Sequence, residues 1–535
     1  MKPVNRNKTK RSQLKIYPVH PRLIPKSDSH TIQFLSARRR FPFLGLQSTL
    51  MVLLLLVIQV SHAEAQGSYF WSQQQKIPEY RASTEEPPYL IADMNHTVHA
   101  FNSQPLNLEN PDSPISVFYR QWTLKNGWTY PNDILFDIDG NALNLLGVTN
   151  DQSGQVHLIV LRNGAIYYTQ NYLANAGNAA SWLVPALIAE GAAGYGPGFE
   201  IIAAIAADPQ GNEIVVIYGG QRDGKGLYST MSSDGGGSWS DPYPIYLTGD
   251  ETMVITDPKL FVGESGLFHA VWTTFLDDGN GGPGFYANFD PETFSWSEPL
   301  ELDEPGIRTP SVIETNGDVF VSYYHHNVNG NWWRRSRDNG VTWTLPEQFS
   351  PRHIGTNGAV SFAVDSGNVL HAFFGERIDD NNHGMWHVTF TGSNWTNIEA
   401  VVRGPQQRGG TAGNGFDPRS ARAVIVNGNT ALVTWGTDGF AGTNGAWYSY
   451  KKLDMPELPS MDLESPTLIP RSTSTIPSNT PIISSIGTAA NNPEIHLDEP
   501  GAAPNPQISI FAGVIPVLAL VFGMIVLYYV VQAKK

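Results

Sequence analysis

The stretch Ser-Ser-Asp-Gly-Gly-Gly-Ser-Trp at residues 232–239 recurs about a hundred residues later as Ser-Arg-Asp-Asn-Gly-Val-Thr-Trp at residues 336–343. Both fit the template S-x-D-x-G-x-[ST]-W. The shared positions are Ser232, Asp234, Gly236 and Trp239, and then Ser336, Asp338, Gly340 and Trp343. Asp and Ser side chains bond to nearby amides, Gly adopts positive φ and Trp packs into a core, so each stretch predicts a β-hairpin turn. Two matches at this spacing indicate a repeat protein.

Tryptophans recur along the chain at intervals of about 50 residues, the length of one propeller repeat. The members of this tryptophan ladder are Trp71, Trp128, Trp182, Trp239, Trp296, Trp343 and Trp395. Between them lie short runs rich in Val, Ile and aromatic residues, bounded by Gly, Asn and Asp, which are typical of strands and turns. Four such strands per repeat, with a ladder tryptophan starting the fourth, are the composition of a propeller blade. Tryptophans scattered through an ordinary enzyme, the alternative, would not keep this spacing.

The number of repeats predicts how the ring closes. Three-strand units are expected to begin near Tyr89, Leu145, Glu200, Thr256, Arg308, Gly358 and Arg419. The last unit has no tryptophan strand after it, and Trp71 has no unit before it. Donating the N-terminal strand to the last blade resolves both and removes an exposed edge. We therefore expect an all-β fold, a seven-bladed β-propeller closed by its N-terminal strand. Six blades is the alternative, if the unit from Tyr89 is an irregular extension.

The repeated template resembles the Asp box of the sialidase-like (BNR/Asp-box repeat) β-propeller superfamily, over residues 69–452. The resemblance implies a propeller fold, with six blades in sialidases themselves. It also implies a site in which three arginines bind the substrate carboxylate, an Asp is the acid/base and a Tyr paired with Glu is the nucleophile. The family's Arg-Ile-Pro motif is absent here, and Arg81 is the nearest N-terminal arginine. Tyr323 or Tyr324 with Glu200 would form the nucleophile pair, but no motif selects them.

The two ends of the chain predict export and membrane anchoring. Residues 1–65 run from a Lys/Arg-rich segment through a short apolar stretch to Ala-Glu-Ala, the order of a signal peptide. An uncleaved anchor, or a start assigned too far upstream, is the alternative. After the propeller (66–455), residues 456–507 are rich in Pro, Ser and Thr and predict a stalk. Residues 508–531 are an apolar run long enough to cross a bilayer as a helix, and the basic tail 532–535 marks the cytoplasmic side.

Composition narrows the partners and the compartment. Asp and Glu number 49 against 34 Lys and Arg, giving a net charge of −15, and there is no cysteine. Nucleic acid and anionic lipid surfaces are poor partners for an acidic module. A propeller of this size can bury a sufficient core without disulfides. We expect a bacterial cell-membrane protein that crosses the bilayer once, with the propeller outside and the C-terminus cytoplasmic.

Charged residues at the start of the inner strands are the candidate site, because propeller ligands bind over the central channel. These residues are Glu200, Asp257, Arg308 and Arg419, with Arg422 slightly further along its strand. Arginines can bind a sugar carboxylate in a bidentate manner, and two acids can serve glycoside hydrolysis. In the alternative interpretation the acids cap turns and the arginines pair with neighbours, which for each residue singly is the more common role.

The sequence predicts no cofactor and no metal site. The segments 277–280 and 379–382 carry Asp and Asn oxygens suited to Ca²⁺, but they lack a known loop spacing and equally resemble ordinary turns. A recurrent histidine on the second strand of the repeat is predicted to pack rather than catalyse. It is found as His99, His157, His269 and His371.

Two classes of function remain after these exclusions. One is a surface-displayed module that binds glycans or cell-surface proteins, which needs only a propeller face and its loops. The other is a sialidase-like exo-glycoside hydrolase of the neuraminidase family, which needs a converging set of arginines and carboxylates that the motifs do not supply. The sequence favours the binding module and leaves catalysis undecided.

Overall fold

The computed structural model describes residues 70–461, apart from 82–85, 108, 111, 193–201, 251, 277–280, 329, 350–354, 380, 405–417 and 438–444. The predicted signal segment 1–65, most of the stalk, the apolar run 508–531 and the tail 532–535 therefore lie outside the described residues. Within the described part of the chain, no helix is long and apolar enough to cross a membrane.

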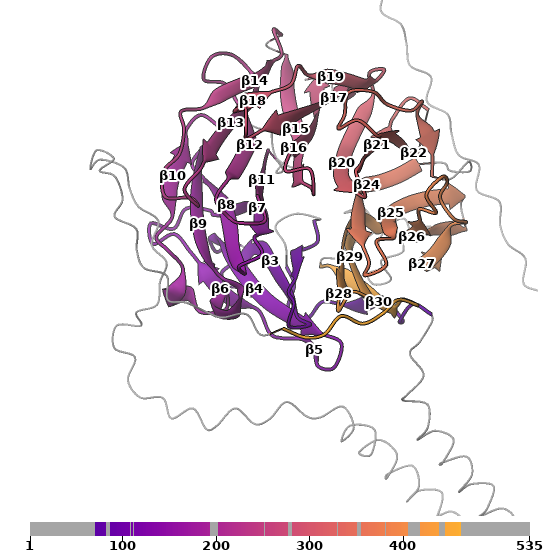
Figure 1. Ribbon diagram of the computed structural model, residues 1–535. Coiled ribbons are helices and arrows are strands. Elements are labelled where there is room, and N and C mark those ends of the chain that lie inside the picture. Colours follow the sequence, from indigo (N-terminus) through magenta and orange to yellow (C-terminus); the bar gives the residue numbers. More distant parts are fainter. Residues whose placement is uncertain are drawn as a thin grey trace, which may run out of the picture. The chain divides into compact units, whose positions relative to one another are not determined.

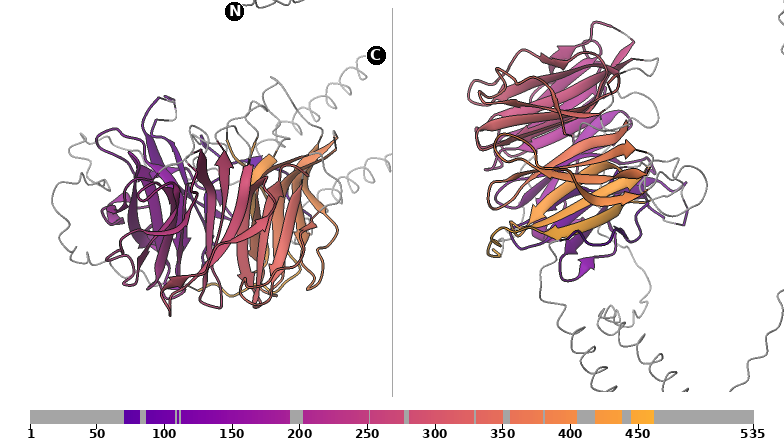
Figure 2. Two further views of the ribbon diagram at one scale, coloured as in Figure 1. Left: turned by 90° about the horizontal axis from the view of Figure 1, so that it is seen from above. Right: turned by 90° about the vertical axis from the view of Figure 1, so that its right-hand side faces the viewer.

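Seven antiparallel sheets surround a central axis and form the blades of a propeller (Figures 1 and 2). Blade 1 consists of β2 (Tyr89–Ala92), β3 (Val98–Pro105), β4 (Ile115–Thr123), β5 (Gly127–Trp128) and β6 (Asn132–Leu135). Blade 2 consists of β7 (Asn144–Asn150), β8 (Gln155–Arg162), β9 (Ala165–Tyr172) and β10 (Ala186–Ala189). Blade 3 consists of β11 (Ala203–Ala207), β12 (Ile214–Gly220), β13 (Gly226–Ser232) and β14 (Tyr243–Leu247). Two short 3₁₀ helices, η1 (Leu173–Asn175) and η2 (Ala179–Ser181), connect β9 to β10.

Blades 4 to 7 repeat the same order of strands. Blade 4 consists of β15 (Met253–Val262), β16 (Phe268–Leu276), β17 (Gly281–Asp290), β18 (Ser295–Trp296) and β19 (Leu300–Asp303), and blade 5 of β20 (Ile307–Thr315), β21 (Asp318–His325), β22 (Asn331–Ser336) and β23 (Glu347–Gln348). Blade 6 consists of β24 (Gly355–Val364), β25 (Leu370–Asp379), β26 (Asn382–Thr389) and β27 (Glu399–Gly404). Blade 7 consists of β28 (Pro418–Val426), β29 (Thr430–Thr437), β30 (Trp447–Lys452) and β1 (Gln75–Lys76). The first strand of each blade contacts the first strands of both neighbouring blades, so these seven strands line the axis. The seven-bladed prediction is confirmed, and the blade that starts at Tyr89 is a regular sheet, which excludes six.

The N-terminal strand closes the ring as the sequence predicted. Strand β1 is the outer strand of blade 7, where Gln75 pairs with Tyr448 and Lys76 with Trp447 of β30. Backbone hydrogen bonds extend this pairing at both ends, from Ser72 N to Tyr450 O at 2.8 Å and from Ile77 N to Ala446 O at 2.9 Å. The last blade is thus built from both ends of the propeller, which leaves no open sheet edge between blades 7 and 1.

The ladder tryptophans lie at the junctions between blades. Each one packs against the second or third strand of the preceding blade: Trp182 on Phe101, Trp239 on Tyr168, Trp343 on Tyr286, Trp395 on Phe320, Trp71 on Phe373, and Trp128 on Tyr448 of blade 7, while the Trp296 indole N–H donates to Ser229. The tryptophans therefore tie neighbouring blades together. Because large aromatic rings contribute much of a core's apolar burial, the regular spacing in sequence follows from one junction per blade.

The prediction that each tryptophan starts the fourth strand needs a correction. In blades 1 and 4 the tryptophan does lie in a short fourth strand, as Trp128 of β5 and Trp296 of β18. In every blade, however, a further or longer outer strand begins four residues after the tryptophan, and in five blades the tryptophan itself lies outside a strand. The residue after each tryptophan instead donates its N–H to a third-strand carbonyl, as Ser240 does to Met231. In six blades a Ser or Thr hydroxyl at that position also accepts a third-strand N–H, as Ser240 does from Met231 at 3.1 Å. Leu183 holds the position in blade 2.

Residues 453–461, which we call the strap, follow β30 across three blades. Ser366 of blade 6 donates its hydroxyl to Pro456 O, Leu458 N donates to Asn427 O of blade 7, and Met461 N donates to Met94 O of blade 1. These contacts all involve the turns that join the first and second strands. The strap therefore lies on the face of the propeller formed by those turns.

The recurrent second-strand histidines are buried in hydrogen-bonded chains, which confirms their predicted packing role. In blades 1, 2 and 4 the Nδ1 atom lies 2.7–2.8 Å from a third-strand tyrosine hydroxyl, and Nε2 lies near a carboxylate. Blade 6 differs, because His387 replaces the tyrosine. His371 Nδ1 lies 2.8 Å from His387 Nε2, and His387 Nδ1 lies 3.0 Å from Glu399, which also binds Lys451 of blade 7.

Removing the Ser72 hydroxyl is expected to weaken the ring closure. The substitution Ser72→Ala leaves the Tyr450 N–H without its 3.0 Å side-chain acceptor, so the free energy of unfolding should fall by about 1–2 kcal/mol. Chemical denaturation of the purified protein measures the change. Gln73→Ala, at an exposed neighbouring position, is the control and should change stability by less than about 0.5 kcal/mol. Equal stability of the two variants would show that the bond does not support closure.

The His371–His387 pair is expected to make stability depend on pH. Burial, together with the charge of the neighbouring His387, lowers the pKa of His371 to about 4. The unfolded chain then binds more protons than the folded one between about pH 4 and 6.5, so the free energy of unfolding should rise with pH across that window, by up to about 3 kcal/mol. Denaturant titrations at a series of pH values measure the slope.

The variant His387→Tyr restores the tyrosine present in blades 1, 2 and 4 and provides the control for that slope. It removes one imidazole and its charge on protonation, so the dependence on pH should become shallower. Identical slopes for the two proteins would show that this pair does not titrate with unfolding.

Candidate functional site

The inner strands of four consecutive blades share a bulge at the start of the central channel. The pairing of the first and second strands shifts register between Thr256 and Lys259, Arg308 and Ser311, Asn357 and Ser361, and Arg419 and Arg422. In each bulge one residue has a left-handed backbone: Asp257 at φ 50°, Thr309 at 46°, Gly358 at 79° and Ser420 at 54°. Three of the four are not glycine, and such strained residues cluster at binding and active sites.

The bulges fit against one another from blade to blade. A β-carbon on Gly358 would overlap the backbone and hydroxyl of Ser420 in the next blade. This position therefore favours glycine for two reasons, the positive φ and the lack of room for a side chain. The Thr309 backbone N–H faces the carboxylate of Asp257. The strained residues thus form a row along the channel rather than isolated defects.

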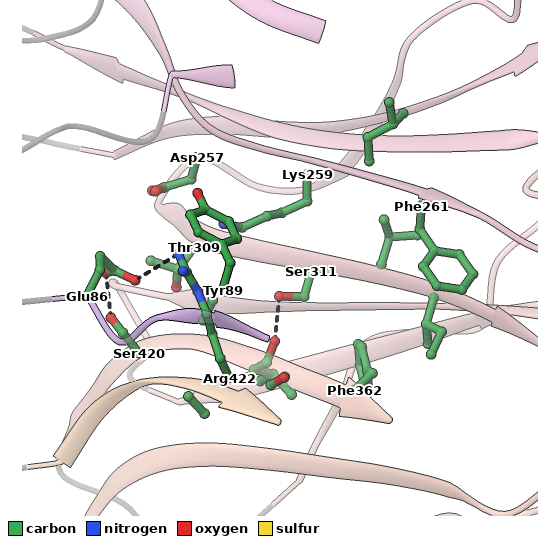
Figure 3. Close-up of a pocket in the computed structure, with 17 residues that line it drawn as sticks. Glu86, Tyr89, Asp257, Lys259, Phe261, Thr309, Ser311, Phe362, Ser420 and Arg422 are labelled. Atoms are coloured by element: carbon green, nitrogen blue, oxygen red, sulfur yellow. Dashed lines mark hydrogen bonds and ion pairs between the residues drawn. The ribbon is translucent and has the colours of Figure 1, made fainter. Parts of the chain in front are cut away.

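A cavity of about 250 Å³ opens at this row (Figure 3). Its lining comes from the inner strands of blades 1 and 4 to 7 and from Glu86, which precedes the first strand of blade 1. The lining residues are Glu86; Tyr89 of blade 1; Asp257, Lys259, Leu260 and Phe261 of blade 4; Thr309, Ser311, Val312 and Ile313 of blade 5; Ala359, Val360, Ser361 and Phe362 of blade 6; and Ser420, Ala421 and Arg422 of blade 7. Charged groups, hydroxyls and aromatic rings therefore face a single space on the axis.

Arg422 and Glu86 form the network that joins blade 7 to blade 1 at the cavity wall. Arg422 donates to Pro87 O at 2.8 Å, lies 3.6 Å from Glu86 Oε2, and places its guanidinium 3.6 Å from the centre of the Tyr89 ring. The Ser420 hydroxyl donates to Glu86 Oε1 at 2.8 Å. Since Arg422 is held on one face by an aromatic ring, its position in the cavity is fixed.

Asp257 and Lys259 occupy the opposite wall, two residues apart on β15. Burial raises the pKa of the Asp257 carboxyl, although the cations of Lys259 and Arg419 oppose the rise. Burial lowers the pKa of Lys259, as does the positive charge of Arg422, while Asp257 and Glu86 act in the opposite sense. Both groups are shifted toward their neutral forms. A buried acid that keeps its proton can donate it, and a buried amine that loses its proton can act as a nucleophile.

The sequence candidates divide between the cavity and its surroundings. Asp257 and Arg422 line the cavity, whereas Arg308 and Arg419 do not belong to its lining. The Arg308 guanidinium lies 5.1 Å from the centre of the Phe275 ring, and the charge of Arg419 acts on Asp257. Glu200 lies outside the described residues. Among the described residues, Arg422 is therefore the one arginine of the lining, and they do not assemble the three-arginine arrangement of sialidases there.

Sequence reasoning missed Glu86, Tyr89 and Lys259. Glu86 precedes the first strand of blade 1 and resembles a linker residue, so no motif marks it. Lys259 had an available signal, because it follows Asp257 by two residues on an inner strand and so belongs to the channel. A charged residue inside a run of apolar strand residues is the pattern that would have found it.

The two turns that match the template have the same geometry and lie away from the cavity. In each, the serine hydroxyl donates to the aspartate at 2.8 Å and accepts the glycine N–H, and the aspartate accepts the N–H four residues on, as seen for Ser232 with Asp234 and Ser336 with Asp338. Gly236 and Gly340 press against Tyr168 and Tyr286 of the preceding blades. These residues stabilise the junctions, and none of them lines the cavity.

Metal ligation has little support in the described part of the chain. There, no group of three or more His, Asp or Glu side chains is placed to hold an ion. The Asp379 carboxylate accepts hydrogen bonds from Asn381 N and the Asn382 side chain, as in an ordinary turn. The other Asp/Asn segment, 277–280, lies outside the described residues, so the alternative of calcium binding there is not tested.

The comparisons with known proteins give matches among solved structures only. No family model matches the sequence, and no curated protein sequence matches it. Among solved structures, the Hadza microbial sialidase is 13% identical with a TM-score of 0.38, and the comparison covers 69% of this chain and 65% of that one. A family PL25 ulvan lyase is 10% identical with a TM-score of 0.45, covering 72% and 96%.

A third similar structure is a fungal alcohol oxidase of the AA5 family in complex with copper. It is 12% identical with a TM-score of 0.46, and the comparison covers 72% of this chain and 76% of that one. This chain spans less than two thirds of the length of the Hadza sialidase. Sialidases are among the solved structures to which the chain is similar. The assignment to seven blades rests on the sheets themselves.

Proposed function

We propose that the protein is a surface-displayed propeller that binds carbohydrate in its central cavity. The observation that carries this proposal is a polar space on the axis, where charged groups, serine and threonine hydroxyls, and the rings of Tyr89, Phe261 and Phe362 meet. Sugars present hydroxyls on their edges and apolar C–H groups on their faces, so they need both kinds of lining. A pocket with a mostly fixed wall and a few convergent polar groups is typical of small-molecule sites.

The size of the cavity favours a small ligand. At about 250 Å³ it lies just below the range of about 300–1,000 Å³ typical of drug-sized ligands. It therefore suits one sugar unit, such as the end of a glycan chain, better than a buried oligosaccharide. A protein partner, the other member of the binding class, would use the outer face of the propeller instead.

The proposed display depends on the ends of the chain and on the strap. The export segment 1–65, the stalk 456–507 and the apolar run 508–531 support a single-pass protein of a bacterial cell surface. The bulges lie near the start of the inner strands, whereas the strap contacts the turns at the other end of those strands. A stalk that continues from Met461 would hold the cavity on the side facing away from the membrane.

The two matched turns support membership of the Asp-box propellers. Both have the serine–aspartate–glycine hydrogen bonds that the template requires. Since they stabilise junctions between blades, they bear on the family and not on the ligand.

A glycoside hydrolase is the second candidate, and one observation favours it. Glu86 and Asp257 share the cavity, and burial raises the pKa of Asp257 as a general acid requires. Two carboxylates with different environments are the usual machinery of glycoside hydrolysis. The sialidase version of this chemistry has weaker support, since Arg308 and Arg419 do not line the cavity.

Removing the arginine of the cavity is expected to weaken sugar binding. The variant Arg422→Met should raise the Kd for a bound glycan by about ten- to a hundredfold, because a charge-assisted hydrogen bond contributes about 1.5–3 kcal/mol. Glycan-array screening of the full-length protein identifies the ligand, and calorimetry measures the Kd. Arg337→Met removes an exposed arginine from a peripheral turn and should leave the Kd unchanged. Equal effects of the two variants would contradict binding in the central cavity.

Incubation with fluorogenic sialosides and a panel of other glycosides distinguishes the two candidates. A binding module should give no turnover above buffer. Turnover that is lost in Asp257→Asn would establish the hydrolase instead, with Asp257 as its acid, and turnover lost in Arg308→Ala would point to the sialidase arrangement. Retained glycan affinity in the inactive variants shows that their cavity is intact.

A further inference from the structure

Lys259 differs from Glu86 and Arg422 in having no side-chain hydrogen bond or ion pair to another described residue. Glu86 is held by Ser420 and Arg422, and Arg422 is held by Pro87 and Tyr89. Among the described residues, no hydrogen bond or ion pair within 4 Å involves Lys259 Nζ. The side chain is partly exposed, and it lines the cavity. Its amino group is therefore available to a molecule that enters the central space.

The surroundings of Lys259 favour the uncharged amine. Burial in the narrow channel lowers its pKa, and the fixed guanidinium of Arg422 adds to the effect. The carboxylates of Asp257 and Glu86 oppose this shift without reversing it. A lysine that loses its proton in a protein interior becomes a good nucleophile toward carbonyl carbon.

Asp257 supplies the complementary acid from the same strand. Its left-handed backbone and the register shift beside it bring its carboxyl group to the cavity wall two residues from Lys259 (Figure 3). Burial raises the pKa of this carboxyl, so it retains a proton at higher pH than an exposed aspartate. An amine and a protonated acid facing one cavity are the two groups that imine formation requires.

We propose that Lys259 forms a reversible imine with small aldehydes that enter the cavity, including short hydroxyaldehydes and the open-chain form of reducing sugars. The amine lone pair adds to the carbonyl carbon, and a proton passes from nitrogen to oxygen to give the carbinolamine. Asp257 protonates the hydroxyl, the C–O bond breaks and water leaves. The resulting iminium then returns a proton to the Asp257 carboxylate. The sum is amine plus aldehyde giving imine plus water, with no change of oxidation state.

This reactivity goes beyond the proposed function and does not require it. A protein that binds no glycan would still form the imine if an aldehyde reaches the cavity, and a glycan-binding protein would bind its ligand without the imine. The probe is therefore glycolaldehyde, which is too small to report on glycan recognition.

Reductive trapping tests the proposal on the full-length protein. The purified chain is mixed with glycolaldehyde and cyanoborohydride at pH 7, and peptide mass mapping follows the modification of each lysine with time. Lys259 should react faster than the exposed Lys125, since a lowered pKa raises the fraction of the amine that is neutral at pH 7. Labelling of Lys259 at or below the rate of Lys125 overturns the proposal.

Two variants separate the roles of the amine and the acid. Lys259→Arg keeps a cation in the cavity and should lose the fast-labelled peptide while the labelling of Lys125 continues. Asp257→Asn keeps the amine and should slow the labelling of Lys259 by about a hundredfold, the usual contribution of a positioned acid. An unchanged rate in Asp257→Asn would remove Asp257 from the mechanism and leave only a reactive lysine. Thermal unfolding of both variants confirms that they are folded.

Discussion

The packing of one tryptophan per blade onto the preceding blade is the constraint on which the ring depends. The indole fills the junction, and the next residue donates its backbone N–H to the third strand of its own blade, so one dipeptide fixes both the junction and the outer edge. Six of the seven blades add a hydroxyl at that position. Trp128 packs on Tyr448 of blade 7, so the junction of the first blade is completed by a residue from the last blade. Closure is therefore a property of the whole ring and is not set by any single blade.

That constraint explains why so much of the fold could be predicted from the sequence. A junction residue must recur once per blade, so the ladder gives the number of blades, and the offset of Trp71 gives the donated strand. The position of the tryptophans relative to the strands could not be predicted in the same way. Trp239 was expected to begin a strand, yet it lies in the turn before β14, whereas Trp128 and Trp296 end the two-residue strands β5 and β18.

The site was less accessible to sequence reasoning, for a physical reason. The cavity is built from residues that are far apart in the chain, and their convergence depends on left-handed bulges whose residues are Asp257, Thr309 and Ser420. Asp and Ser are ordinary turn residues, and a threonine with positive φ leaves no mark in a sequence. Asp257 was found because it begins a strand unit, whereas Glu86 became part of the cavity only through its contact with blade 7.

The strain in these bulges is held by the closed ring. Non-glycine residues in the left-handed region cost about 1–3 kcal/mol each and persist only where the surroundings determine them. Here the neighbouring blades do so, since Gly358 fits against Ser420 and the Ser420 side chain in turn binds Glu86. The same contacts that close blade 7 onto blade 1 therefore fix the wall of the cavity that carries Arg422.

The hydrogen bonds of the strap determine the order in which the chain would detach under tension. Tension along the chain beyond Met461 meets the hydrogen bonds of the strap to blades 1, 7 and 6 before it reaches β30. Those hydrogen bonds are spread along the segment and would break one after another. The loss of each bond would release a short length of chain. The strap would therefore detach before the pairing of β30 with β1 came under tension, and blade 7 would stay closed.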